Sequence, residues 1–546
     1  MAGGAPPPGE DPDRRGQHHA APPRDPHHRA PHRSGLVSLG RALGVGLLGL
    51  EGTMVEVEAQ LAPGLPAFRI VGLPDAALGE ARERVRAAFQ SAGHRLPDRR
   101  ITVNLSPASL PKHGTAFDLA IAVAVAAAGA MPGRDVARRT VHLGELGLDG
   151  RVHPVRGVLP MVACAVAAGH HRVVVSRGNE AEAVLVPGAE VRAVDHLGDV
   201  LALYGISLDV RHDGEQTVPV APGGEEPEPP DMADVVGQTE ARFALEVAAA
   251  GGHHLFLTGP PGAGKTMLAS RLPSILPDLG DEDAVEVTSI HSIAGTFRPA
   301  GGLIRRPPFE SPHHTASPVS IIGGGSGIPR PGAVSRSHCG VLFLDEAPEF
   351  PSSVLQTLRQ PIESGRIVLH RARAVAAYPA RFQLVLAANP CPCGGGSACE
   401  CPAAVRRRYS QRLGGPLLDR VDMRIQVARI TRARAVLGGR GEPSAMVADR
   451  VLRARARQAA RFSGMPWSLN SSAPGRWLRG PDAPLDADVR RRLERSVERG
   501  LLTMRGLDRV LRLAWSLADL TERDKPTLDL VGQALTLRTG GGDAAV

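Results

Sequence analysis

The strongest chemical signal in the sequence is a glycine-rich loop that ends in a lysine and a threonine. The loop reads Gly-Pro-Pro-Gly-Ala-Gly-Lys-Thr and fits the pattern GxxxxGK[ST]. Its glycines let backbone N–H groups turn toward phosphates at the positive end of a helix. Lys265 would contact the β- and γ-phosphates of ATP, and Thr266 would ligate Mg²⁺. The predicted nucleotide-binding residues are Gly259, Pro260, Pro261, Gly262, Ala263, Gly264, Lys265 and Thr266.

Two carboxylates and an amide follow apolar runs farther along the chain. Asp345 and Glu346 come directly after Val341–Leu344, which is a Walker-B pattern. Here Asp345 would hold Mg²⁺ through its water shell, and Glu346 would polarise the attacking water as a general base. Asn389 follows the apolar run Phe382–Ala388. Its amide could orient the lytic water between the two Walker elements, or it could be a turn or helix-capping residue before the next proline.

Four of the six cysteines lie close together, which indicates a local site rather than a disulfide framework. Their spacing is CxCx5CxC on a glycine-rich loop, and four thiolates could close tetrahedrally around a structural Zn²⁺. Free thiols, or a redox or different metal site, are the alternatives. A catalytic zinc is not expected, because four protein ligands leave no position for water. The four residues are Cys391, Cys393, Cys399 and Cys401.

The elements that must position these groups are predicted from the apolar pattern. Residues 233–428 alternate strands and helices, as in a doubly wound α/β sheet. Residues 35–205 also mix strand and helix patterns and predict a compact α/β or α+β domain. Residues 206–232 are acidic and rich in Pro and Gly, so we expect an interdomain linker. Residues 429–546 are Arg-rich and helical, and residues 1–34 are rich in Pro and His and should be disordered.

Individual elements can be predicted in the first of these domains. Alternation with period two predicts strands at Thr53–Ala59 and Arg100–Leu105. Ala76–Ala92 has the pattern of an amphipathic helix, and Phe117–Gly129 that of a buried, Ala-rich helix. Arg172–Ser176 reads as a short buried strand.

Composition excludes several classes of protein. The chain has 546 residues, of which 42% are hydrophobic and 22% charged, with a net charge of +8. This is the composition of a globular rather than a disordered protein. The longest uncharged apolar run, Leu119–Met131, is too short to span a bilayer. The N-terminus lacks the apolar region of a secretory signal. We therefore expect a reducing, cytoplasmic location and no membrane partner.

Taken together, these motifs resemble an AAA+ ATPase. Asp234–Gln238 is similar to the segment that precedes Walker A in that family. Leu417–Asp422 resembles the arginine-finger motif of the magnesium-chelatase and MCM branch, and Thr503–Ala514 resembles its sensor-2 helix. The resemblance implies that Arg420 reaches the γ-phosphate of a neighbouring subunit and that Arg505 contacts nucleotide from the lid. A finger supplied in trans implies an oligomer, most simply a hexameric ring; either arginine alone would otherwise be a surface or salt-bridged residue.

Longer motifs resemble the magnesium-chelatase-like ComM/YifB family over about residues 35–546. One departure is Glu310, where the family usually has Arg before Pro-His-His, and this change could alter what the segment contacts. The motifs are Gly64–Asp75, Arg100–Lys112, Pro308–Ser317, Gly323–Ser335, Gly340–Phe350 and Asn389–Gly394.

The same resemblance implies an N-terminal domain with the fold of ribosomal protein S5 and the Lon protease. Pro111–Asp118 resembles the Lon stretch that carries the nucleophilic serine, but Ala116 occupies the serine position. Gly150–Leu159 resembles the stretch that carries the lysine, but Leu159 occupies that position. Without a hydroxyl or an amine there is neither nucleophile nor base, so we expect no protease activity.

The resemblance to the ComM/YifB family also implies an ATP-driven motor that moves on branched or single-stranded DNA and promotes branch migration in recombination and transformation. Two β-rich arms around His370, Arg371 and Arg373 predict a hairpin, which in related ring motors projects into the channel. Its arginines would suit phosphates, although a solvated hairpin tip is the alternative. A second candidate for the DNA contact is a stripe of arginines on one face of a predicted helix, and the alternative is that this face is simply exposed to solvent. The stripe is Arg450, Arg453, Arg457 and Arg461.

Two other functions remain open from the sequence. One is a magnesium-chelatase motor subunit, which inserts Mg²⁺ into a porphyrin; the domain that precedes the motor argues against it. The other is a regulatory or chaperone-like AAA+ protein that remodels a protein partner. Stimulation of ATP hydrolysis by protein rather than by DNA would favour that function.

Overall fold

The structure is a computed structural model of the chain. The segment 1–34, most of the predicted linker 206–232, and Arg373 lie outside the residues that it describes. The described residues are 38–72, 76–108, 112, 114–129, 131–208, 230–325, 329–371, 374–395, 399–429, 441–500 and 502–540.

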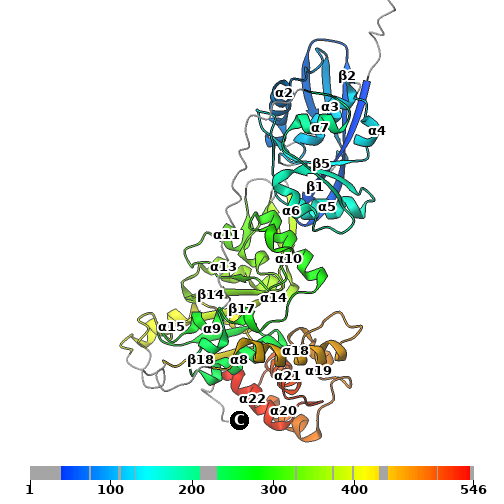
Figure 1. Cartoon of the computed structure of the whole chain (residues 1–546). Helices are drawn as coiled ribbons and strands as arrows, with labels where there is room; N and C mark the ends of the chain where they lie inside the picture. Colours follow the sequence, from blue (N-terminus) through cyan, green and yellow to red (C-terminus); the bar gives the residue numbers. More distant parts are fainter. Residues whose placement is uncertain are drawn as a thin grey trace, which may run out of the picture.

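The N-terminal part, blue to cyan in Figure 1, is built on a seven-stranded mixed sheet of order β3-β4-β2-β1-β5-β8-β9. The pairs β1–β2 and β2–β4 are antiparallel, and the other four pairs are parallel. A two-stranded ribbon, β6–β7, lies beside it. The strands are β1 Ser38–Leu48, β2 Glu51–Ala62, β3 Ala67–Val71, β4 Arg100–Ser106, β5 Val141–Leu143, β6 Glu145–Leu146, β7 Val152–His153, β8 Arg172–Ser176 and β9 Glu190–Val194.

Helix α3 explains how this sheet is covered. All eleven of its residues are buried, because small Ala side chains let the helix lie close on β1 and β2. The strands predicted from alternation are present as β2 and β4, and the predicted short buried strand is β8. The helix predicted over 76–92 is interrupted at Glu80. The helices are α1 Ala76–Gly79, α2 Ala81–Ser91, α3 Asp118–Ala128, α4 Arg134–Ala137, α5 Val158–Ala167, α6 Glu180–Ala183 and α7 Leu197–Leu203.

The middle part, green to yellow in Figure 1, contains a five-stranded sheet in which every pair is parallel. Its order is β11-β14-β17-β10-β18, so β10 lies between two strands that come much later in the chain. The doubly wound α/β prediction is confirmed. The strands are β10 Leu255–Thr258, β11 Phe309–Glu310, β14 Val341–Leu344, β17 Gln383–Ala388 and β18 Met423–Gln426.

Both faces of this sheet are buried, which is why its strands read as continuous apolar runs. Phe343 and Val385 point into the core shared with the C-terminal helices, and Leu344 and Leu386 point into the core on the opposite face. Helices cover both faces, and β15–β16 and β12–β13 add two ribbons. These elements are α8 Thr239–Gly251, α9 Lys265–Ala269, α10 Asp281–Ala294, α11 Pro318–Ile322, β12 Gly323–Gly324, β13 Arg330–Pro331, α12 Ala333–Arg336, α13 Ser352–Thr357, α14 Arg359–Ser364, β15 Arg366–Arg371, β16 Ala374–Pro379, α15 Ala403–Gln411 and α16 Gly415–Leu418.

The C-terminal part is helical, as predicted, and packs on α8. Its central helix α21 begins at Thr503, whose hydroxyl accepts a hydrogen bond from the Gly506 N–H at 3.1 Å and so caps the helix. Trp515 on α21 is buried in the same core as Phe343 of the sheet, so this lid and the sheet share one hydrophobic core. The helices are α18 Ser444–Arg461, α19 Gly475–Leu478, α20 Ala487–Glu498, α21 Met504–Leu520 and α22 Leu528–Thr539.

The N-terminal part contacts the middle part through the end of α10. The Ser292 hydroxyl of α10 donates a hydrogen bond to the buried Glu182 carboxylate of α6, which also accepts from the Leu159 N–H at 2.9 Å. Burial raises the pKa of Glu182 above its ordinary value. A second contact brings the turn at Gly49 against the backbone of Ala377 in β16.

None of the helices in the described part of the chain is both long enough and apolar enough to cross a membrane.

Candidate functional site

The three predicted catalytic segments meet at one edge of the five-stranded sheet. Strands β14, β17 and β10 are adjacent and parallel, so their carboxyl ends lie side by side. The residues that follow them are Asp345, Asn389 and Gly259. The strand order therefore brings together groups that are far apart in the sequence.

The glycine-rich loop has a shape that suits phosphate. Gly262 and Gly264 have φ values of 73° and 91°, a left-handed conformation that glycine adopts without strain. Within the described part of the chain, the N–H groups of Gly262, Gly264, Lys265 and Thr266 have no acceptor. They are available to bind the oxygens of an anion at the start of α9.

Lys265 lies under this loop and beside the end of β17. Its ammonium group donates to the Gly259 carbonyl at 2.8 Å and to the Asn389 side-chain oxygen at 3.0 Å. Burial lowers the pKa of Lys265, and the charges of Asp345 and Glu346 oppose that shift. Asn389 is thus held against the lysine that would contact the terminal phosphates.

The oxygen atoms of Thr266 and Asp345 suit a magnesium ion. The Thr266 hydroxyl lies 2.6 Å from the Asp345 carboxylate, and a hydroxyl plus a carboxylate are hard oxygen donors of the kind that Mg²⁺ prefers. Glu346, the next residue, is exposed and has a left-handed φ of 50°, which turns it away from the line of β14.

One residue at this site is not predicted from the sequence. His314, in the loop between β11 and α11, has its Nδ1 atom 3.3 Å from the Glu346 carboxylate. Its ring also packs against His313, with ring centroids 4.2 Å apart. The Pro-His-His motif was the available signal, but nothing local in it indicated a contact with the Walker-B strand.

Gln238, in the segment that precedes Walker A, also reaches the loop. Its side-chain amide donates to the Ala263 carbonyl at 3.1 Å and to the Ala428 carbonyl at 2.6 Å. It therefore ties the loop to the chain that leaves β18.

The opposite, amino edge of the same sheet carries a cavity of about 860 Å³. Among its lining residues, His254 precedes β10, Gly340 precedes β14 and Phe382 precedes β17. No residue of the glycine-rich loop lines it. Both Arg420 and Arg505 line this cavity, so the structure brings the two predicted arginines together but places both away from the loop of their own chain.

The two arginines differ in their partners. The Arg420 guanidinium donates to the Pro416 carbonyl at 2.6 Å and to the Glu363 carboxylate. Arg505 is exposed at the start of α21 and has no hydrogen bond or ion pair to any described residue. Arg505 is therefore free to bind an anion that enters the cavity.

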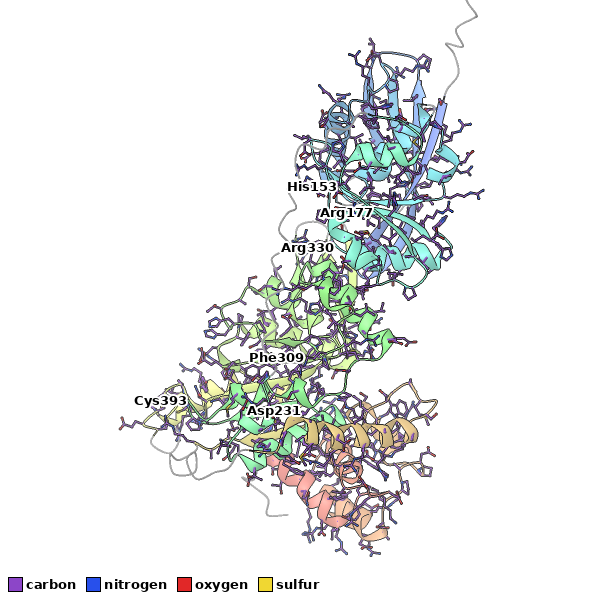
Figure 2. All side chains as sticks on the ribbon, viewed as in Figure 1. His153, Arg177, Asp231, Phe309, Arg330 and Cys393 are labelled. Carbon is purple, nitrogen blue, oxygen red and sulfur yellow. The ribbon has the colours of Figure 1, made fainter. Side chains whose placement is uncertain are left out.

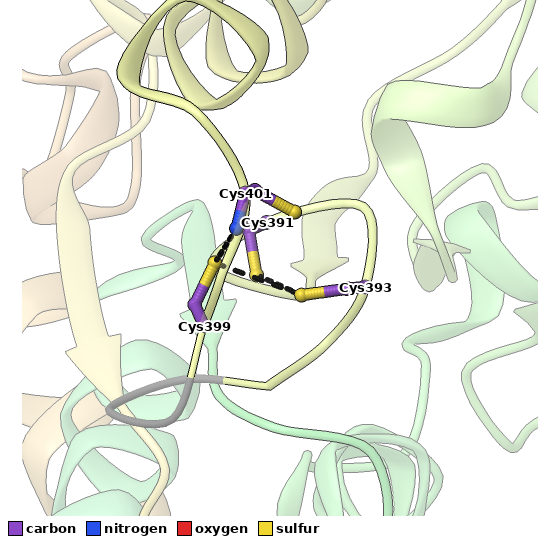
Figure 3. A group of neighbouring side chains, drawn as sticks. All are labelled: Cys391, Cys393, Cys399 and Cys401. Atoms are coloured by element: carbon purple, nitrogen blue, oxygen red, sulfur yellow. Dashed lines mark hydrogen bonds between the residues drawn. The ribbon is translucent and has the colours of Figure 1, made fainter.

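The four clustered cysteines also converge, and Figure 3 shows their sulfur atoms close together. The Sγ atoms of Cys391 and Cys393 are 3.2 Å apart, those of Cys393 and Cys399 are 3.6 Å apart, and all four lie within 4.8 Å of one another. Zinc bonded to four thiolates at ~2.3 Å has sulfurs separated by about 3.8 Å, so the cluster fits a tetrahedral ion. Hydrogen bonds from the Gly395 N–H and from the neighbouring thiols lower the pKa of Cys393 to about 6.

The cysteine loop lies directly against the glycine-rich loop. Cys391 is two residues beyond Asn389 and is buried, and a Cβ atom added to Gly394 would lie 2.6 Å from the Pro261 side chain. Figure 2 shows that Cys393 lies at the periphery of the middle part.

The predicted hairpin is present as β15 and β16, which pair antiparallel from Arg366 to Pro379. His370 and Arg371 are exposed near its tip, and the tip residue Arg373 lies outside the described part of the chain. The tip of β15 packs beside α11, which follows His314 by four residues.

The predicted arginine stripe on α18 has a different role. Arg450 is bonded to Glu246 at 2.6 Å and to Glu442 at 2.5 Å, and Arg461 is paired with the buried Asp519. Arg453 and Arg457 also have carboxylate partners. Each arginine of the stripe therefore has a carboxylate partner within the chain, so the stripe is a face of ion pairs and not a row of unpaired charges.

Glu310, the departure from the family pattern, forms a two-point ion pair. Its carboxylate accepts from Arg336 Nε at 2.9 Å and from Arg336 Nη2 at 2.7 Å. The acidic residue therefore joins β11 to α12.

Comparison with known proteins supports the same family along nearly all of the chain. Residues 231–435 match the family described as magnesium chelatase, subunit ChlI, residues 57–179 match its subunit ChlI of Mg-chelatase domain, and residues 441–538 match its C-terminal domain. The chain is 39% identical to YifB of Escherichia coli over 500 residues, which is 90% of this chain and 95% of YifB. The chain belongs to the magnesium-chelatase-like ComM/YifB family.

Other members of the ComM/YifB family are similar over comparable lengths. The competence protein ComM of Haemophilus influenzae is 37% identical over 486 residues, 87% of this chain and 92% of that protein. A protein of Mycobacterium tuberculosis, Rv2897c, is 50% identical over 509 residues, 92% of this chain and 99% of that protein.

A shorter stretch of the chain is similar to part of a Lon protease. Lon protease 1 of Thermus thermophilus is 32% identical over 181 residues, which is 30% of this chain and 22% of that protein. Ala116 and Leu159, which stand where the protease residues are expected, are both buried, and Ala116 belongs to an apolar core.

Proposed function

We propose that this ComM/YifB-family protein is an ATP-hydrolysing ring motor that translocates on branched or single-stranded DNA. The observation that carries the ATPase part is the convergence of three strand ends. The Thr266 hydroxyl lies 2.6 Å from the Asp345 carboxylate, and the Lys265 ammonium lies 3.0 Å from the Asn389 side-chain oxygen. Four N–H groups of the adjoining loop have no acceptor among the described residues, those of Gly262, Gly264, Lys265 and Thr266. This set of groups suits a nucleoside triphosphate with its magnesium ion.

Each residue has a defined task in hydrolysis. The loop from Gly259 to Thr266 and Lys265 would bind the phosphates, and Thr266 and Asp345 would hold Mg²⁺, which when bound neutralises charge on the transferred phosphoryl group. Glu346 would accept a proton from the attacking water, and Asn389 would orient that water beside the lysine.

The position of the two arginines supports a ring. Arg420 and Arg505 line a cavity at the amino edge of the sheet, whereas the glycine-rich loop lies at the carboxyl edge. They would therefore reach the γ-phosphate only in a neighbouring subunit, which makes each site incomplete without a second copy of the chain. We propose a homo-hexamer, as expected for this family.

The hairpin is the proposed DNA contact. Six copies of Arg371 and Arg373 would bring about twelve positive charges to a central channel, and such charges bind phosphates without reading sequence. Branch migration in recombination or natural transformation is the proposed cellular task, supported by the 37% identity to the competence protein ComM.

We further propose that Cys391, Cys393, Cys399 and Cys401 hold a structural zinc ion. Such thiolates stay reduced in a compartment like the cytoplasm. Zinc analysis of the purified protein should give one ion per chain, and less than a tenth of that in a Cys391→Ser, Cys393→Ser variant. Cys164→Ser, which alters a cysteine outside the cluster, is the control.

The test of the motor function is ATP hydrolysis with no DNA, with single-stranded DNA and with a four-way junction, each at two salt concentrations. We expect DNA to stimulate hydrolysis, and the stimulation to weaken at higher salt as phosphate contacts are screened. A preference for the junction would support branch migration. Robust hydrolysis that ignores all DNA would overturn the DNA function and favour a protein or porphyrin client.

Two variants refine this test. Arg371→Ala should reduce stimulation by DNA and leave hydrolysis without DNA unchanged. Arg366→Ala is the matched control, because Arg366 is exposed on the same strand but at the base of the hairpin.

A further inference from the structure

We infer that Arg509, on lid helix α21, is a positioning residue. It holds residues 420–422, the finger loop, in the position that the neighbouring active site requires. This inference rests on the proposed role of Arg420 in trans. The inference adds a specific task for the lid. Through Arg509, the lid bonds to the segment that carries Arg420 and not to the glycine-rich loop of its own chain.

The contacts of Arg509 are with the backbone and side chain of the finger loop. Its Nη1 atom donates to the Arg420 carbonyl at 3.0 Å and to the Asp422 carboxylate at 2.5 Å. The second lid helix contributes in the same way: Arg538 donates to the Val421 carbonyl and, at 3.4 Å, to the Asp422 carbonyl. Three successive residues of the finger loop are therefore bonded to the lid.

Asp422 anchors this arrangement to the sheet. Its other carboxylate oxygen accepts the His254 N–H at 3.0 Å and lies 3.6 Å from His253 Nδ1, at the start of β10. Burial would raise the pKa of Asp422, but the neighbouring His253 ring and the charge of Arg509 hold that pKa well below its ordinary value. A buried carboxylate with these partners gives Arg509 a fixed docking point.

The spacing on α21 explains why one helix suits this task. Arg505 and Arg509 are four residues apart, one turn of the helix, so they lie on the same face. That face lines the cavity that also contains Arg420. Fixing α21 on Asp422 therefore places the free guanidinium of Arg505 and the backbone of Arg420 in one rigid unit.

Register matters here because a charged group acts on a transition state only within hydrogen-bond reach. A misplacement of about 1 Å can reduce a rate about 100-fold. Backbone hydrogen bonds to Leu417 and His254 also hold the finger loop, and the lid adds the bonds that fix its carbonyl groups.

The experiment is a subunit-mixing assay with Arg509→Gln and Arg509→Lys. Alone, Arg509→Gln should hydrolyse ATP about 10- to 100-fold more slowly, with unchanged affinity for a fluorescent ATP analogue, because its own loop is intact. Arg509→Lys should fall between the wild type and Arg509→Gln. Mixed with Glu346→Gln subunits, which supply an intact finger but cannot hydrolyse, Arg509→Gln should regain activity.

Two controls separate this inference from simpler effects. Arg450→Gln removes an arginine that ties the lid to α8 and does not touch the finger loop; it should lower stability without a 10-fold loss of hydrolysis. Arg420→Ala is mixed with Glu346→Gln in parallel to test the role in trans itself.

The outcomes are distinguishable. If Arg420→Ala mixtures stay inactive, the proposed arrangement in trans fails, and the positioning role fails with it. If they recover but Arg509→Gln mixtures do not, Arg509 acts within its own subunit and the inference is wrong. Wild-type activity of Arg509→Gln alone also overturns it. If Arg509→Gln does not fold, Arg509→Lys decides between the same outcomes.

Discussion

Lys265 and Glu346 illustrate how single residues divide the chemistry at the carboxyl edge of the sheet. Lys265 lies among loop carbonyls and Asn389, where it would meet the phosphates, whereas Glu346 lies on the solvent side of Asp345. Lys265→Ala should therefore weaken ATP binding at least 10-fold, while Glu346→Gln should retain binding and lose hydrolysis by about 100-fold or more. Analogue fluorescence and phosphate release measure the two effects. Equal loss of binding in both variants would contradict the division.

His314 gives a second prediction at the residue scale. Its contact with the Glu346 carboxylate should hold that carboxylate in position, so His314→Ala should lower kcat about 10-fold with little change in KM for ATP. His314→Asn, whose side-chain amide can take the place of the Nδ1 atom beside the carboxylate, should recover part of the loss. Steady-state kinetics provide the measurement.

His313→Asn is the matched control for His314. His313 packs on the His314 ring and bonds to Thr315, but has no contact with Glu346. If both histidine variants lose the same activity, the effect comes from the loop as a whole and not from the contact with Glu346.

At the scale of elements, the cysteine loop supports the glycine-rich loop. Gly394 has a φ of 70°, and an added Cβ would lie 2.6 Å from Pro261. Gly394→Ala should therefore displace the loop and weaken ATP binding several-fold. Gly464→Ala, at a φ of 77° with no atom within 4 Å of the added Cβ, introduces only backbone strain and should leave ATP binding unchanged. Equal ATP affinity of the two variants would show that the loops are independent.

The contact between α10 and α6 should depend on pH. Burial raises the pKa of Glu182 above its ordinary value near 4.5, so the folded state favours the protonated carboxyl group more than the unfolded state does. The contribution of Glu182 to the free energy of unfolding is complete below about pH 4.5 and is lost as the pH rises through the raised pKa. Glu182→Gln stays neutral, so its Tm should exceed the wild-type Tm by a few degrees at pH 7.5 and match it near pH 4.5.

Thermal unfolding across that pH range measures the difference. Glu180→Gln is the control on the same helix, because Glu180 is paired with Arg177 at the surface and should not change the pH dependence. A Glu182→Gln variant that is less stable than wild type at pH 7.5 would contradict the prediction.

At the scale of the whole molecule, each active site is proposed to need a neighbour. Hydrolysis per chain should therefore rise steeply with protein concentration and level off where a ring forms, because assembly brings Arg420 and Arg505 to the next loop. Sedimentation velocity and phosphate release on the same samples measure this. In Arg420→Ala the ring should still form while hydrolysis stays low, and hydrolysis that is independent of concentration in a monomeric sample would contradict the arrangement.

Local pattern alone determined much of this protein. The loop from Gly259 to Thr266, the strands before Asp345 and Asn389, and the β15–β16 hairpin could be predicted because turn chemistry and apolar runs act over a few residues. The resemblance to the ComM/YifB family followed from the same short motifs and is confirmed along nearly the whole chain.

Only the tertiary structure decided which distant groups meet. Sheet order put Asn389 on Lys265, and packing put His314 beside Glu346 and Gly394 beside Pro261. The tertiary structure also paired the arginines of α18 with carboxylates. It placed Arg420, Arg505 and Arg509 around one cavity at the amino edge of the sheet. These contacts join residues that local sequence cannot relate, because long-range partners are chosen by how buried faces pack and not by the spacing within either segment.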